Sequence, residues 1–241
     1  LISLVCDTFH RRSSRRALTF LRGGVVETRL SFGRLERDSG MAAARFSRMG
    51  LRRGDRAVIF MPKSVYWVVA YLAVQRLGAV AVPLNPVRKP AEAGYFLKDT
   101  KPKLAVVGPA QGEIVRKAGS GAAIFQVDTG RPYESASFRE HDSGPGVPVE
   151  NRMDEPALIL YTSGTTGLPK GAVLTYRNLT HDAQNVAGIW EITSRDTLCH
   201  ALPLFHAHGL CFGLHTCLLV GAGVVMLDVF DPEVVLDVLS R

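Results

Sequence analysis

The chain has 241 residues, of which 46% are apolar and 21% are charged, and its formal net charge is +7. This composition excludes a disordered chain and is typical of a globular protein with one large core or two smaller ones. No uninterrupted apolar run reaches the roughly 18 residues of a membrane-spanning helix, and the apolar segment at the amino end is too short for a secretory signal.

The positive charge is concentrated near the amino end. Residues 1–56 carry thirteen arginines against five acidic residues, so the rest of the chain is close to neutral. A solvated face is the simpler interpretation, and no nucleic-acid motif accompanies it, so no nucleic-acid partner is expected. Four cysteines without a secretion signal indicate free thiols in a reducing compartment. We expect a cytoplasmic protein, with a mitochondrial address as the alternative because the start is rich in Arg and Ser.

From residue 17 to residue 108, short apolar runs alternate with longer apolar or amphipathic segments. Residues 17–30 contain two β-rich runs around Gly23-Gly24, which predicts a hairpin. A helix is expected to begin after Ser31. Strands are then expected at 56–60, 79–84 and 103–108, with helices between them. Residues 31–108 therefore form βαβ units, which predict an α/β fold with a mainly parallel sheet covered on both faces.

Residues 109–150 lose this alternation and are rich in Gly, Ser, Pro and charge. We expect them to be irregular and to close a first subdomain, residues 1–150. A second α/β subdomain would begin in residues 151–241. Its expected elements are strands at 157–163 and 171–175, a helix at 176–190, strand-like segments at 196–203 and 224–228, and a helix start at 231.

The two strands at 157–163 and 171–175 flank the sequence YTSGTTGLPKG, residues 161–171. Backbone N–H groups hold phosphate oxygens, and glycines and small residues let several of these groups turn toward one point. The segment adds four hydroxyl groups and the charge of Lys170. It is not a Walker A loop, because Gly171 follows the lysine and the next residues favour a strand over a helix. Composition alone leaves a flexible connector as the alternative to a phosphate-binding loop.

The same eleven residues resemble the phosphate-binding signature of the AMP-forming adenylating enzymes, which include acyl-CoA synthetases and aryl-CoA ligases. Residues 51–86 resemble the amino-terminal region of these enzymes. CHALPLFHAHGL, residues 199–210, resembles their acyl-site segment. The resemblance implies the layered αβαβα fold, with mainly parallel sheets, of the large amino-terminal domain of this superfamily.

The reaction that the resemblance implies is the activation of a carboxylate by ATP, with Mg²⁺, followed by transfer of the acyl group to CoA. In the first step, fixed donors stabilise charge on the phosphate oxygens. The residues that the resemblance assigns to the ATP-phosphate site are Thr162, Ser163, Gly164, Thr165, Thr166, Gly167 and Lys170. It places the Mg²⁺ ligand and the ribose and CoA contacts beyond residue 241. We therefore expect a truncated amino-terminal part that is inactive alone and holds no metal ligand.

Residues 199–217 contain three cysteines and four histidines, a density that is also found in zinc sites. Cys211 and His215 would share one helix face, but no Cys-x₂-Cys or His-x₃-His pair is present, and the cysteines lie among apolar residues. The resemblance instead matches His206 to the histidine beside the reacting carboxylate, which makes it the catalytic candidate. Phe205, His208 and Gly209 complete the expected substrate pocket. A buried structural histidine remains the alternative for His206, and is favoured for His200 and His215.

The substrate class is indicated by charge and by the form of the acyl-site segment. No acidic residue lies between Asp196 and Asp228, whereas amino-acid adenylation domains usually carry one there to hold the ammonium group. The sequence HAHG resembles the malonyl-CoA and oxalyl-CoA synthetase branch, which favours a short dicarboxylic acid such as malonate. The alternatives are a fatty or aromatic acid within the superfamily, a non-catalytic nucleotide-binding module, and a metal-binding domain around residues 199–217.

Overall fold

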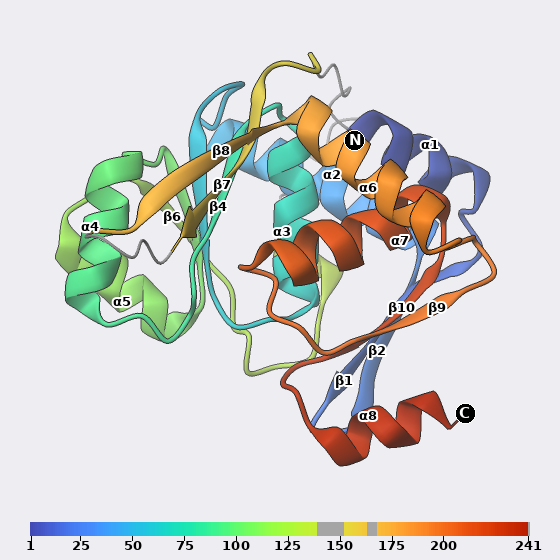
Figure 1. The fold of residues 1–241 in the computed structure, drawn as a ribbon. Coiled ribbons are helices and arrows are strands. Elements are labelled where there is room, and N and C mark those ends of the chain that lie inside the picture. The colour runs from blue at the N-terminus through green and yellow to red at the C-terminus, as the bar shows by residue number, and fades with distance from the viewer. Residues whose placement is uncertain (139–151, 163–167, 241) are drawn as a thin grey trace.

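The computed structural model describes residues 1–138, 152–162 and 168–240 and has two sheets with helices before, between and after them (Figure 1). The helices are α1 (Ile2–Arg11), α2 (Phe32–Arg48), α3 (Val65–Arg76), α4 (Pro90–Thr100), α5 (Pro109–Ala118), the 3₁₀-helix η1 (Ser135–Phe138), α6 (Tyr176–Ile189), the π-helix η2 (His208–His215), α7 (Thr216–Val220) and α8 (Pro232–Leu239). The strands are β1 (Arg16–Arg22), β2 (Val25–Ser31), β3 (Arg56–Phe60), β4 (Val80–Pro83), β5 (Leu104–Val107), β6 (Ala123–Gln126), β7 (Pro156–Thr162), β8 (Lys170–Thr175), β9 (Thr197–His200) and β10 (Gly223–Leu227).

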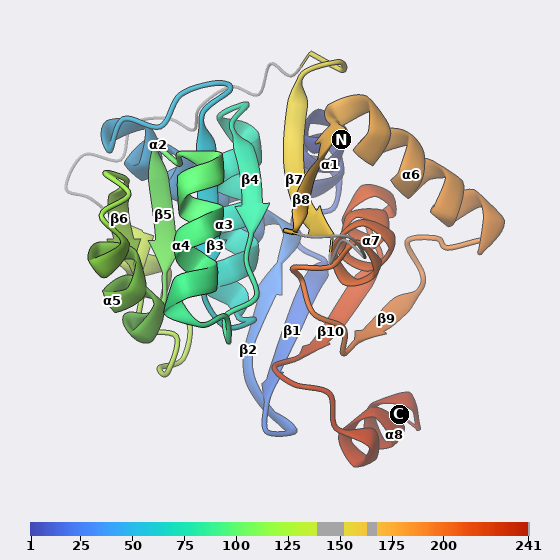
Figure 2. The ribbon, with the colours of Figure 1, turned by 60° about the vertical axis from the view of Figure 1, so that its left-hand side comes forward.

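The first sheet has the strand order β6-β5-β3-β4-β7-β8 and is parallel except for β8, which runs antiparallel to β7. Side chains of a strand alternate between its two faces. Val58 and Phe60 therefore pack against α4 and α5, while Ala57 and Ile59 belong to the larger core on the other face. Figure 2 shows α4 and α5 in front of this sheet. The prediction of a mainly parallel sheet covered on both faces is confirmed.

Helix α3 lies between the two sheets, and every one of its residues is buried. This burial explains why the sequence of α3 is apolar on all sides. Ser64 caps the helix by accepting a hydrogen bond from the Trp67 N–H at 3.3 Å. Trp67 and Tyr71 stack with ring centroids 5.5 Å apart. Helices therefore cover the outer face of the first sheet and fill the space between the two sheets, which agrees with the layered α/β fold that the family resemblance implies.

The second sheet has the order β2-β1-β10-β9. The predicted hairpin is confirmed: β1 and β2 are antiparallel, and Gly23 and Gly24 take the positive φ angles of 53° and 78° that the two-residue turn requires. β1 also pairs in parallel with β10, with Leu18 opposite Val224. Each sheet thus takes strands from both sides of residue 150. The expected subdomain boundary at 150 does not coincide with the division between the sheets.

One other expectation differs from the structure, and one helix was not expected at all. The stretch 109–150 was expected to be irregular, but α5 and β6 occupy its first part. Pro109 at the first turn and Gly119, with φ of 61°, after the last turn bound α5. Helix α1 had no sequence prediction; Ile2, Val5 and Phe9 bury one face of it. Among the described residues, no helix combines the length and the apolar character needed to cross a membrane.

Candidate functional site

The phosphate segment, residues 161–171, begins in β7 and ends in β8, and these two strands are paired. Thr162, the last residue of β7, lies opposite Lys170, the first residue of β8, and Tyr161 lies opposite Gly171. The Thr162 hydroxyl donates to the Lys170 carbonyl oxygen at 3.4 Å, and both residues are exposed. The remaining predicted phosphate ligands, Ser163, Gly164, Thr165, Thr166 and Gly167, lie outside the described residues. The structure therefore places the two ends of the segment, Thr162 and Lys170, next to each other.

The strand that follows Lys170 agrees with the exclusion of a Walker A loop. A Walker A lysine lies at the start of a helix, whereas Lys170 starts β8. A Cβ atom on Gly171 would lie 2.9 Å from Cγ2 of Ile159 and 3.4 Å from the Tyr161 ring, so a larger residue there would have to displace the Ile159 side chain. The glycine lets the side chains of β7 cross close to β8.

The acyl-site segment connects β9 to the π-helix η2. The rings of Phe205 and His206 are in contact, with centroids 4.5 Å apart, and His206 is exposed. The interpretation of His206 as a buried core histidine is therefore wrong. His208 is also exposed, and Gly209 is buried in the first turn of η2. Within the described residues, no hydrogen bond or ring contact joins this segment to Thr162 or Lys170.

His200, at the end of β9, holds the first turn of η2 in place. Its Nε2 atom donates to the Gly209 carbonyl oxygen at 2.7 Å. Burial lowers the pKa of His200, so the imidazole is neutral and carries its proton on Nε2. A Cβ atom on Gly209 would lie 2.3 Å from the Pro203 carbonyl oxygen, so only glycine fits this close approach. His200 is buried as the sequence favoured, but its partner was not predictable from any motif.

Lys63 is a second residue that sequence reasoning missed. Its ammonium group donates to the carbonyl oxygens of Ala201 at 2.9 Å and Leu202 at 3.1 Å. Burial lowers the pKa of Lys63 to about 8, and the nearby Asp228 and Cys199 oppose this shift. The loop after β3 is thereby joined to the segment that leads to Phe205. Its signal in the sequence is weak, a charged residue three positions after the end of a buried strand.

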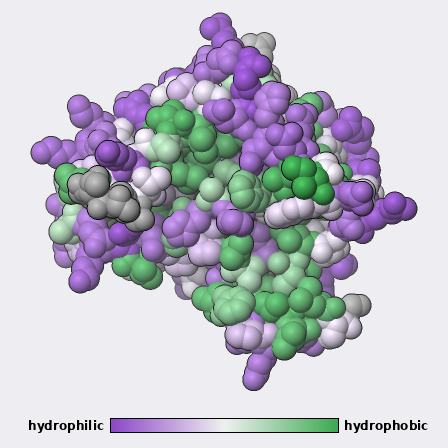
Figure 3. Space-filling model, in the orientation of Figure 1, coloured by the Kyte–Doolittle hydropathy of each residue, from purple (hydrophilic) through white to green (hydrophobic). Residues whose placement is uncertain are grey.

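Lys63 lies on the wall of a cavity of about 460 Å³ between the carboxyl ends of β3, β9 and β10. In open parallel sheets, ligands bind at this end of the strands. Phe205 and Gln111 line the cavity, and the exposed Val229 and Phe230 form part of its edge. Figure 3 shows apolar surface gathered over this region and over α8, which follows it in the chain. Asp228 lines it as well, so the cavity combines a cation and a carboxylate with mostly apolar walls.

A second cavity, of about 250 Å³, lies between β9 and η2. His208 and Phe212 form one wall, with ring centroids 4.9 Å apart, and Trp190 and Leu198 line it as well. The buried Nδ1 atom of His200, which also lines this cavity, has no hydrogen-bond partner among the described residues. This arrangement offers an apolar pocket with two imidazole rings.

The cysteines and the remaining histidine do not assemble a metal site. Burial raises the pKa values of Cys211 and Cys217 to about 12 and lowers that of His215 to about 3. His215 stacks on Tyr71 with ring centroids 5.4 Å apart. Thiols must lose their proton to bind zinc, which these surroundings oppose. In the part of the chain that the structure describes, no group of three His, Cys, Asp or Glu side chains is placed to hold a metal ion.

Residues 7–241 match the model of a protein family described as AMP-binding enzyme. The chain is 35% identical to an oxalate–CoA ligase of Arabidopsis thaliana, over 77% of the chain and 37% of that protein. It is 35% identical to a mitochondrial malonate–CoA ligase of Mus musculus, over 77% of the chain and 32% of that protein. It is 34% identical to a 4-coumarate–CoA ligase of Oryza sativa, over 97% of the chain and 44% of that protein. The chain therefore spans less than half the length of these relatives.

The fold has a counterpart among solved structures. The crystal structure of ATP-bound MatB from Rhodopseudomonas palustris aligns with a TM-score of 0.88 and 30% identity, over the whole chain and 48% of MatB. The αβαβα arrangement of the described residues is therefore that of a known domain.

Proposed function

The chain belongs to the AMP-binding enzyme family, and from this premise we propose that it forms part of an ATP-dependent, AMP-forming acid–CoA ligase. One observation carries the proposal. The antiparallel stem of β7 and β8 holds Thr162 and Lys170 next to each other, on either side of the hydroxyl- and glycine-rich sequence. A hydroxyl group and an ammonium group at the end of a sheet suit the oxygens of a polyphosphate.

The proposed reaction has two steps. A carboxylate oxygen of the substrate attacks the α-phosphorus of ATP, a new oxygen–phosphorus bond forms, and the bond to the β-phosphate oxygen breaks, which releases pyrophosphate. The CoA thiol then attacks the acyl carbon, loses its proton, and displaces AMP. In the first step, Lys170 would stabilise the negative charge on the phosphate oxygens, and the Thr162 hydroxyl would exchange its bond to the Lys170 carbonyl oxygen for one to a phosphate oxygen.

The proposed role of His206 is to orient the substrate carboxylate through a ring N–H group. An exposed imidazole beside Phe205 can reach a ligand, which a buried one could not. ATP enters such reactions with Mg²⁺. Because the described residues offer no group of side chains that fits a metal ion, no step is assigned to a metal held by them.

For the acid, we propose a short dicarboxylate. The relatives named as oxalate–CoA and malonate–CoA ligases support this choice, as does the HAHG sequence at His206 and His208. A second candidate is an aromatic acid. It is favoured by the apolar walls of the 250 Å³ cavity beside His208 and by the relative named as a 4-coumarate–CoA ligase.

The test is carboxylate-dependent release of pyrophosphate from ATP, measured on the protein made from its complete reading frame. Malonate, oxalate, methylmalonate, acetate, benzoate, 4-coumarate and a fatty acid form the panel. The proposal predicts the highest kcat/KM with malonate or oxalate, whereas a preference for 4-coumarate or benzoate would select the second candidate. ATP binding without pyrophosphate release for any acid would contradict ligase activity and favour a non-catalytic nucleotide-binding module.

A charge variant tests the role of the phosphate segment. Lys170→Ala removes a cation next to the proposed phosphate site, and we expect a loss of about 10- to 100-fold in kcat/KM for ATP, the size of one charged hydrogen bond. Lys117→Ala, which removes an exposed lysine from α5, is the matched control. Equal activities of the two variants would remove Lys170 from the site.

A further inference from the structure

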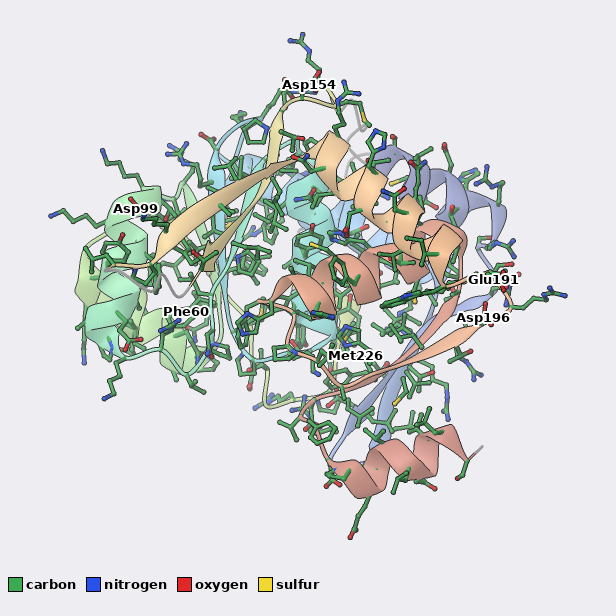
Figure 4. All side chains as sticks on the ribbon, in the orientation of Figure 1. Phe60, Asp99, Asp154, Glu191, Asp196 and Met226 are labelled. Carbon is green, nitrogen blue, oxygen red and sulfur yellow. The ribbon has the colours of Figure 1, made fainter. Side chains whose placement is uncertain are left out.

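One face of α4 is hydrogen-bonded to both sides of the phosphate stem, which is the antiparallel pair of β7 and β8. Tyr95 and Asp99 are four residues apart on α4, so their side chains lie on the same side of the helix. The Tyr95 hydroxyl donates to the carbonyl oxygen of Pro169 at 2.9 Å, immediately before β8. Figure 4 labels Asp99 on α4, beside the start of β8. A single helix thus contacts the return strand of the segment just before Lys170.

The other strand is held by Asp99. The Tyr161 hydroxyl, on β7, donates to the Asp99 carboxylate. The Tyr161 ring also packs edge-on against Phe96 of α4, with centroids 4.5 Å apart. Burial and the Asp99 hydrogen bond both raise the pKa of Tyr161, so its hydroxyl keeps its proton and remains a donor. The strand that leads into the segment is therefore fixed one residue before Thr162.

These two ties act on opposite ends of the same short segment. Tyr161 precedes Thr162, and Pro169 precedes Lys170. Both bonds reach α4 from residues more than 60 positions away in the sequence. The paired strands alone fix the distance between the two ends. The bonds to α4 also fix the direction of the stem relative to the first sheet, on which α4 packs.

Building on the proposed function, we propose that Tyr95 and Asp99 are positioning residues for ATP. They hold the two ends of the phosphate segment so that Thr162 and Lys170 are in place before the nucleotide arrives. Groups that are already held in place lose less conformational entropy when a ligand binds. Loosening either tie should therefore weaken binding of ATP and leave the interaction with the carboxylate substrate unchanged.

Two tyrosine-to-phenylalanine variants isolate the hydrogen bonds from the packing. Tyr95→Phe and Tyr161→Phe each remove one hydroxyl group and keep the ring. We expect each to raise the Kd for ATP, measured by calorimetry, about five-fold, the value of one hydrogen bond, and the double variant about 25-fold. Asp99→Asn keeps an oxygen that can accept from Tyr161, so its effect should be smaller than that of Tyr161→Phe.

A distant tyrosine provides the matched control. The Tyr133 hydroxyl donates to the Asp38 carboxylate of α2 at 2.8 Å, and Tyr133 belongs to the larger core, not to the cluster under α4 against which Tyr95 and Tyr161 pack. Tyr133→Phe also loses a tyrosine–aspartate bond, and any general loss of stability would appear in its melting temperature, but its Kd for ATP should stay within two-fold of the unmodified protein. The KM for the carboxylate should be unchanged in all of these variants.

The outcomes separate this proposal from the proposed function. A Kd for ATP within two-fold of the original in the double variant would overturn the positioning role. So would an equal rise in Tyr133→Phe, because the effect would then be one of general stability. ATP binding that depends on Tyr95 and Tyr161 without any pyrophosphate release would keep the positioning role and refute the ligase activity.

Discussion

Gly209 gives the sharpest test of how the acyl-site segment is built. It lies in the first turn of the π-helix η2, against the backbone of the preceding loop, and a Cβ atom there would lie 2.3 Å from the Pro203 carbonyl oxygen and 3.0 Å from the Pro203 carbonyl carbon. Both neighbours are main-chain atoms, which cannot move away by changing a rotamer. In Gly209→Ala, either the loop or the helix must shift, and the 2.7 Å hydrogen bond from His200 to the Gly209 carbonyl oxygen shifts with it.

The expected cost is at the upper end of that of an overpacked site, about 3 kcal/mol in the free energy of unfolding. For a chain of this length, that loss lowers the melting temperature by roughly 6 to 12 °C. Gly188→Ala is the control, because Gly188 lies in α6 with no atom within 4 Å of the added Cβ. Alanine should stabilise that exposed position by about 0.5 to 1 kcal/mol.

Urea unfolding of the two variants, followed by circular dichroism, measures both free energies. A loss below about 0.5 kcal/mol in Gly209→Ala would refute the reasoning, because the Pro203 carbonyl would then be no barrier to a side chain. A loss in Gly188→Ala as large as that in Gly209→Ala would also refute it. The effect would then belong to glycine replacement in general and not to this close approach.

Three further predictions concern buried groups. His200→Phe leaves the Gly209 carbonyl oxygen without its donor, and should cost about 1 to 3 kcal/mol in urea unfolding. Because burial lowers the pKa of His215 to about 3, the unfolded chain takes up a proton below about pH 6.5 that the folded chain does not, so stability is lost as the pH falls. Between pH 7.5 and pH 5.5, the free energy of unfolding should fall by about 1.4 kcal/mol less in His215→Phe than in the original protein. An equal fall in the two proteins would contradict the neutral, buried state of His215. Since burial raises the pKa values of Cys211 and Cys217 to about 12, iodoacetamide at pH 8 should modify them only after denaturation, as read by mass spectrometry, and rapid native labelling would count against their burial.

The elements that the sequence predicted are those whose signals are local. β3, β4 and β5 are short apolar runs, and the structure has each within one residue of its predicted bounds; α3 is an apolar run that begins directly after the capping Ser64. Helix α5 was missed although Pro109 and Gly119 mark its ends, because its polar composition outweighed those signals. The residues at the two ends of α5 indicated the helix better than its overall composition did.

The division into sheets could not be predicted, because it depends on pairing between distant strands. β1 pairs with β10, which lies about 200 residues further along the chain, and β7 joins the first sheet through the single pair Ala81 and Leu158. A change of composition along the chain does not indicate which strand another strand pairs with. Register between remote strands is set by burial of their faces, which a linear pattern does not contain.

The residues of the candidate site also fall into two groups: those that motifs in the sequence identify, and those that only the fold reveals. Motifs identify the groups that would touch a ligand, such as Lys170 and His206, because those groups lie together in short sequences. The residues that hold these groups in position do not lie together in short sequences. His200 and Lys63 donate to backbone carbonyl oxygens, and a carbonyl acceptor leaves no mark on the amino-acid sequence. Positioning residues were therefore visible only once the chain was folded.

These holding contacts relate both parts of the site to neighbouring strands. Lys63 follows β3 and binds the start of the acyl-site segment, while α4 follows β4 and carries Tyr95 and Asp99, which hold the phosphate stem. β3 and β4 are hydrogen-bonded in parallel, with Val58 opposite Val82. The carboxyl ends of two adjacent strands thus set where the phosphate segment and the acyl-site segment lie relative to each other. A carboxylate and an α-phosphorus must meet within bonding distance for the proposed reaction, and a shared pair of strands is a rigid means of keeping that distance.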